Sequence, residues 1–98
     1  MEQSLAVKRL GELGHDTRMS VFRLLVRAGD GGLPVGDIQS RLDLKAATLS
    51  HHLHRLIAAG LVRQTREGRV LYCFACLDAV AEVAAFLGSE CCTLETGA

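Results

Sequence analysis

The chain has 98 residues, 49% of them apolar and 22% charged, and its formal net charge at pH 7 is zero. This composition predicts one globular domain over residues 1–98 and excludes a disordered chain. No apolar run is long enough for a secretory signal or a membrane span, so we expect a cytoplasmic protein without a membrane partner. Four cysteines in that compartment favour metal binding, redox chemistry or plain burial over a disulfide framework.

Basic and acidic side chains lie in different parts of the chain. Residues 41–69 hold six basic side chains, two acidic ones and three histidines. Residues 70–98 hold no basic side chain, four acidic ones and all four cysteines. This division indicates two roles on one chain, one in the basic middle and one in the cysteine-containing tail.

Helical spacing of apolar residues predicts a first helix over residues 3–13, ended by Gly14. We expect Asp16 or Thr17 to cap a second helix, whose apolar face continues to about Val26. The glycine-rich stretch 28–34 predicts a loop.

A third, two-turn helix is expected from Asp37 to Leu42, and a fourth from near Lys45 to a C-cap at Gly60. One apolar stripe defines the fourth helix, namely Ala46, Leu49, Leu53, Leu56 and Ile57. Residues off this stripe are polar and face outward.

After Gly60 the runs 61–65 and 69–74 are β-prone, and the link 66–68 contains a glycine, which predicts a hairpin. A last helix is expected from about Cys76 to about Cys92. Two short helices, a tight turn and a basic hairpin form a winged helix-turn-helix, so the fold class is mainly α with a β-hairpin wing.

A winged helix-turn-helix offers the polar face of its second helix, here 45–59, to the major groove of DNA. Arginines on or beside the hairpin (Arg63, Arg66 and Arg69) can reach the DNA backbone or a minor groove. The plainer alternative is a surface helix with solvated arginines.

The segments "LGHDTRMSVFRLL" (13–25) and "LDLKAATLSHHLHRLIAAGLVRQTREGRVLYCF" (42–74) closely resemble the ArsR/SmtB family of bacterial metalloregulatory repressors. The resemblance implies a winged-helix homodimer joined through its first and last helices, with the fourth helix on operator DNA. Lys45 departs from the family's capping residue, and Asp43 is expected to cap instead. The DNA-facing set expected from this resemblance is Lys45, Ala47, Thr48, Ser50, His51, His52 and Arg55 on the helix, with Arg66 and Arg69 on the wing.

Metal ligation by His51 and His54 is an alternative, but the family uses these positions for DNA contact or packing. The family's cysteine motif is missing from "LPVGDIQ" (33–39), and residues 76–98 contain no histidine for a zinc-type site. Thiols remain as the sensing groups, namely Cys73, Cys76, Cys91 and Cys92.

Cys91 and Cys92 are adjacent, so their Cα atoms lie about 3.8 Å apart, too close for an unstrained disulfide. Both thiolates can bind one soft ion. The pair resembles the family subgroup that responds to arsenite or antimonite, which implies a repressor released by As(III) or Sb(III), with no cofactor required. We expect the third thiolate to be the partner subunit's Cys76 or Cys73, although burial explains Cys73 equally well.

Cys76 and Cys91 are fifteen residues apart, about 22 Å along one helix, which is why we expect the site to join two subunits. Alternatives with the same fold are a thiol redox or persulfide sensor and a Cd, Hg or Zn sensor. A thiol enzyme that uses "CFAC" (73–76) lacks the βαβ context of such redox motifs, and we expect no enzymatic activity. A dimerisation module without DNA binding is a further alternative.

Overall fold

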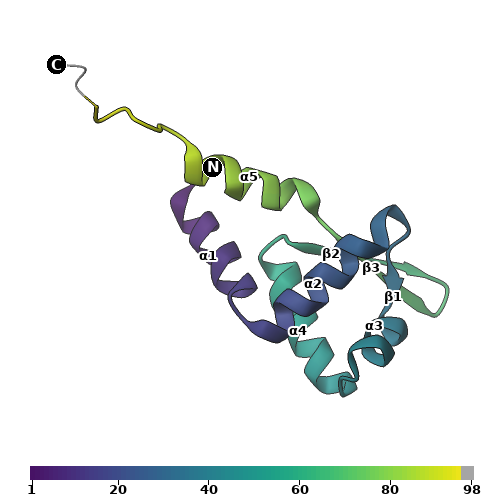
Figure 1. Cartoon of the computed structure of the whole chain (residues 1–98). Helices are drawn as coiled ribbons and strands as arrows, with labels where there is room; N and C mark the ends of the chain where they lie inside the picture. The colour runs from purple at the N-terminus through teal and green to yellow at the C-terminus, as the bar shows by residue number, and fades with distance from the viewer. Residues whose placement is uncertain (96–98) are drawn as a thin grey trace.

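A computed structural model of the chain describes residues 1–95, so the last three residues of the predicted domain lie outside the described range. It contains five α-helices, a 3-10 turn and a small sheet (Figure 1). The elements in chain order are α1 (Gln3–Leu13), α2 (Asp16–Ala28), η1 (Gly29–Gly31), β1 (Leu33–Pro34), α3 (Val35–Leu42), α4 (Ala46–Ala58), β2 (Val62–Glu67), β3 (Val70–Ala75) and α5 (Leu77–Gly88). No helix within residues 1–95 is long and apolar enough to cross a membrane.

The boundaries of the first four helices agree with the predicted ones to within two residues, but the capping residues differ. His15 caps α2, because its Nδ1 accepts a hydrogen bond from the backbone N–H of Thr17 at 3.2 Å. Asp43 adopts a left-handed conformation (φ 52°, ψ 52°) and ends α3, so it does not cap α4 as expected. Lys45 occupies the N-cap position of α4 and makes no side-chain capping bond.

The sheet has three antiparallel strands in the order β1-β3-β2. The hairpin is confirmed, but β1 was missed, because it is only two residues long inside the predicted loop. Leu33 lies opposite Cys73 on β3, and Gly32 brings the chain against the same strand. Gly32 has a φ of 62°, and a Cβ there would lie 2.5 Å from the carbonyl oxygen of Cys73. Only glycine therefore fits this approach.

Aliphatic side chains from α2, α3, α4 and the hairpin form one core. The members with the least solvent contact are Val21, Leu25, Ile38, Leu49, Leu56, Leu61 and Cys73. Because α4 buries one stripe in this core, its remaining faces are fixed relative to the hairpin. In Figure 1, α3 and the hairpin lie at the end of the molecule opposite to the C-terminal part of α5.

α1 and α5 contact each other, and Figure 1 shows them at the side of the molecule from which the C-terminal segment extends. Arg9 on α1 joins three elements. Its Nε donates to the carbonyl of Ala59, just after α4, and its Nη1 donates to the carbonyl of Ala79 on α5, both at 3.1 Å. This buried guanidinium fixes α1 and α5 against the end of α4.

The prediction that the last helix reaches Cys92 is wrong. α5 ends at Gly88, and Ser89 takes an extended conformation (ψ 151°), while its hydroxyl donates to the carbonyl of Phe86 at 2.7 Å. Cys91 and Cys92 lie in turns beyond the helix, where Glu90 and Cys92 have positive φ angles of 59° and 66°. The apolar spacing on which the prediction was based gives no sign of this end, because Gly88 and Ser89 interrupt the helix only after the last apolar residue of α5.

Candidate DNA-binding surface and thiol groups

α4 presents most of the predicted DNA-facing side chains to solvent. Lys45, Ala47, Thr48, Ser50 and His51 are all exposed, on the side of the helix that does not pack in the core. The first turn of α4 holds no acidic residue, so its free backbone N–H groups are available to an anion such as phosphate. The polar side chains among them, such as those of Thr48, Ser50 and His51, can donate and accept hydrogen bonds at the edges of bases.

His52 was expected to face DNA, and the structure places it in the interior with 7% exposure. Its Nδ1 lies 3.4 Å from Nη1 of Arg18 on α2, and its ring lies 4.9 Å from that of His15. Burial, followed by the charges of His15 and Arg18, lowers the pKa of His52, which favours the neutral acceptor form. His52 therefore packs α4 against the start of α2 and lies in the interior, not on the exposed face of the helix.

Arg55 is the second residue of α4 whose surroundings differ from the predicted DNA-facing role. Its Nε and Nη2 donate to the two carboxylate oxygens of Glu12 on α1, at 2.8 and 2.9 Å. Nε of Arg18 lies 3.2 Å from the same carboxylate and donates to the backbone carbonyl of Glu12 at 2.7 Å. No local pattern in the sequence marks this carboxylate, because its two partners lie on other helices.

The wing carries the predicted arginines in exposed positions. Arg66 lies opposite Leu71 near the tip of the hairpin, and Arg69 lies in the turn between β2 and β3. Arg63 lies nearer the base, with its guanidinium 4.1 Å from the centre of the Phe74 ring, a cation–π contact. The two arginines at the tip are therefore free to reach phosphates, while Arg63 is held against the sheet.

Cys73 is fully buried in β3, and its sulfur accepts a hydrogen bond from Nε2 of Gln64 at 3.4 Å. Burial raises the pKa of the Cys73 thiol, which disfavours the thiolate that binds soft ions. Both properties are those of a packing residue in the core. Cys76, by contrast, is half-buried at the N-cap of α5, where its backbone N–H donates to the carbonyl of Leu61 at 2.8 Å.

Cys91 and Cys92 are both exposed, and their sulfur atoms lie 3.0 Å apart as free thiols. The Cys91 thiol and then Glu95 raise the pKa of Cys92. Among residues 1–95, no three His, Cys, Asp or Glu side chains are grouped closely enough to hold an ion. One chain therefore offers a thiol pair, and a three-thiolate site needs a further ligand from elsewhere.

An apolar hollow of about 190 Å³ lies between α1 and α5. Two of the residues that line it, Leu10 and Leu87, are exposed, Leu87 to 63%, and Val7, three residues before Leu10 on α1, is exposed as well. The residues around the hollow are Arg9, Leu10, Leu13, Val80, Val83, Ala84 and Leu87. A continuous apolar surface of this kind on two adjacent helices is typical of a face that packs against another protein surface.

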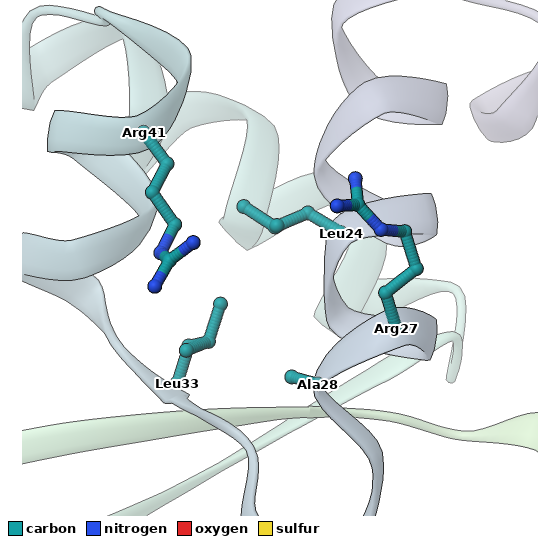
Figure 2. Close-up of a pocket in the computed structure, with 5 residues that line it drawn as sticks. All are labelled: Leu24, Arg27, Ala28, Leu33 and Arg41. Carbon is teal, nitrogen blue, oxygen red and sulfur yellow. The ribbon is translucent and has the colours of Figure 1, made fainter.

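Another pocket, of about 240 Å³, lies between α2, β1 and α3 (Figure 2). Leu24, Ala28 and Leu33 form its apolar part, and the guanidinium of Arg41 points into it. Arg27 and Arg41 lie in the last turns of α2 and α3, where a positive charge stabilises the end of a helix. None of the predicted DNA-facing or thiol residues lines this pocket.

The fold and the exposed polar face of α4 define a winged helix-turn-helix domain, and comparison with known proteins supports this class. The helix-turn-helix domain family matches residues 13–65. The "putative arsenical resistance operon repressor ArsR2" of Halobacterium salinarum is 35% identical over 63 residues, which cover 64% of this chain and 52% of that protein. The aligned segment thus spans about half the length of this relative.

Two solved structures share the fold. The crystal structure of an ArsR family transcriptional regulator has a TM-score of 0.80 and 23% identity, and the match covers 98% of this chain and 96% of that one. The homodimeric winged helix-turn-helix DNA-binding domain Mb0332 from Mycobacterium bovis has a TM-score of 0.72 and 23% identity, covering 93% and 82%. The chain belongs to the helix-turn-helix domain family, and its sequence relative and structural neighbours support the predicted ArsR/SmtB winged-helix regulator.

Proposed function

We propose that the protein is a dimeric repressor that binds operator DNA and is released by As(III) or Sb(III). The observation that carries the DNA-binding part is the exposed polar face of α4, whose opposite face is fixed in the core. Thr48, Ser50 and His51 are free to contact base edges. The arginines at the wing tip supply positive charge for the backbone.

The homodimer is supported by the apolar surface of α1 and α5, which includes Leu10 and Leu87. Burial of this surface against a second copy removes exposed apolar area and places two α4 helices about a two-fold axis. Two recognition helices related in this way fit two half-sites of a palindromic operator. Mb0332, which has the same fold, is described as homodimeric.

The inducer site is supported by the exposed thiols of Cys91 and Cys92, which lie close enough to bind the same ion. As(III) or Sb(III), when bound, would be held by three thiolates. Cys76 of the partner subunit is a better third ligand than Cys73, because Cys73 is buried and bonded to Gln64. The related protein named as an arsenical resistance operon repressor supports the choice of arsenic.

Arg9 provides a physical connection between α4 and α5, the helix that lies between Cys76 and the thiol pair. It contacts both the carbonyl that follows α4 and a carbonyl in the first turn of α5, so a shift of α5 displaces the end of α4. A small change in the dimer geometry then alters the separation of the two α4 helices. Release follows because the inducer favours the geometry that does not fit the operator.

The test is fluorescence anisotropy of the reduced protein on a duplex selected by binding from a random pool. We expect arsenite to release the wild-type protein at a lower concentration than cadmium or zinc. Cys91→Ser and Cys76→Ser variants should bind DNA but resist arsenite, while Cys73→Ser should respond like the wild type. Release by zinc alone, or full release of Cys91→Ser by arsenite, contradicts the arsenic assignment.

A redox sensor is the second candidate, favoured by the exposure of the free Cys91 thiol and the partial exposure of the free Cys76 thiol. Oxidation would join Cys91 of one subunit to Cys76 of the other, with two electrons and two protons passing to an oxidant such as peroxide. Mass spectrometry after peroxide or arsenite separates the candidates. A disulfide-linked dimer released from DNA by peroxide, with no effect of arsenite, would favour the redox sensor.

A further inference from the structure

We propose that Glu12 sets the DNA affinity of this protein by holding Arg55 away from the DNA backbone. This inference rests on the proposed DNA binding and concerns residues outside the thiol site. Arg55 follows His51 by four residues and Thr48 by seven on α4, so the three side chains share one face of the helix. Arg55 is thus on the DNA-facing side, yet its guanidinium is bonded to a carboxylate of the same chain.

The geometry of the pair explains why Arg55 cannot serve both partners. Nε and Nη2 form a two-point contact with Glu12, at 2.8 and 2.9 Å, and this edge of the guanidinium is the one that also matches a phosphate. The carboxylate neutralises the charge that would otherwise displace counterions from DNA. Arg55 therefore adds little to DNA affinity while the pair is intact.

Glu12 is the fixed member of the pair. Its side chain is 12% exposed and also contacts Arg18, whereas the side chain of Arg55 is 48% exposed. Arg18 itself is held by the backbone carbonyl of Glu12 and by His52. The hydrogen bond from Arg55 lowers the pKa of Glu12, so the carboxylate is ionised at neutral pH. A free Arg55 could turn toward DNA, whereas Glu12 cannot leave the junction of α1 and α2.

Glu12→Gln removes the charge and keeps the size of the side chain. The probe is a fluorescein-labelled mixed-sequence duplex of several helical turns, because phosphate contacts do not depend on sequence. We expect tighter binding at low salt and a steeper salt dependence. The slope of log K against log salt should steepen by about 0.9 for each new phosphate contact, or about 1.8 for a dimer. The advantage over the wild type should then shrink about 3.5-fold per contact between about 50 and 200 mM salt.

Three controls separate release of Arg55 from other effects. Arg55→Gln should bind about as tightly as the wild type, and the Glu12→Gln/Arg55→Gln double variant should bind like Arg55→Gln. Glu2→Gln makes the same charge change at an exposed position before α1 and should leave the slope unchanged. Circular dichroism and thermal unfolding check the fold, and Glu12→Asp, which keeps the charge but shortens the side chain, serves if Glu12→Gln unfolds.

The outcomes are distinguishable from those of the proposed function. If the wild-type protein fails to bind the duplex even at low salt, DNA binding itself is wrong. If the wild type binds and Glu12→Gln shows an unchanged slope, only the role of Glu12 is wrong. An equal gain from Glu12→Gln in the wild-type and Arg55→Gln backgrounds also overturns the inference, because the effect would then come from the lost negative charge and not from Arg55.

Discussion

Replacing Arg9 tests how much the contact between α1, α4 and α5 contributes to stability. Arg9→Met keeps the apolar stem of this buried side chain but removes both hydrogen bonds to the carbonyls of Ala59 and Ala79. It also removes the weaker ion pair with Glu82, in which the closest atoms are 3.6 Å apart. The carbonyl of Ala59 then lacks this partner at the end of α4.

A hydrogen bond from a charged group contributes about 1.5–3 kcal/mol net, so two of them give about 3–6 kcal/mol. Methionine avoids the desolvation of a guanidinium and keeps the packing of the stem, which offsets part of this loss. We therefore expect Arg9→Met to lower the free energy of unfolding by about 3 kcal/mol. For a domain of this size the melting temperature should fall by about 12–24 °C, at about 4–8 °C per kcal/mol.

Urea unfolding followed by circular dichroism measures this change, with all variants at one protein concentration because dimer stability depends on concentration. The matched control is Lys8→Met, which changes an exposed cation on the same helix and should shift stability by less than about 0.5 kcal/mol. An Arg9→Met variant within about 0.5 kcal/mol of the wild type would show that Arg9 does not fix α1 and α5 to α4.

Three more predictions concern the core and the interior histidine. Gly32→Ala should destabilise the protein by more than about 1 kcal/mol in urea unfolding, because its Cβ would meet the carbonyl of Cys73, whereas Gly36→Ala, with open space on α3, should be neutral or stabilising by up to about 1 kcal/mol. His52→Gln should lower stability by about 1–3 kcal/mol without the loss of a direct DNA contact. His51→Gln changes an exposed side chain, so it should weaken DNA binding and leave stability within about 0.5 kcal/mol of the wild type. The reverse pattern would contradict the placement of these two side chains. The pKa of His52 is lowered in the folded protein, so the unfolded chain binds the proton more tightly and stability should fall as the pH drops below 6.5. Unfolding curves at pH 7.5 and about 5.5 measure this change, and the His52→Gln variant should lose this part of the pH dependence.

Helical spacing could have placed two of these side chains in the interior. His52 lies three residues after Leu49 and four before Leu56, so its position on the buried stripe could be read from the spacing. It was assigned to DNA by resemblance instead. Arg9 likewise falls three residues after Ala6, on the buried face of α1, so the same spacing indicates an interior cation in need of partners.

The sequence alone predicted the first four helices, the hairpin and the exposed face of α4, because these depend on spacing and turn residues that act over short ranges. It also placed the arginines of the wing and the adjacent thiols. The packed structure was needed to show that β1 pairs with β3 and that Cys73 is a core residue. It alone showed that Glu12 holds Arg55, since a hydrogen bond across 43 positions depends on how three helices pack and leaves no local pattern.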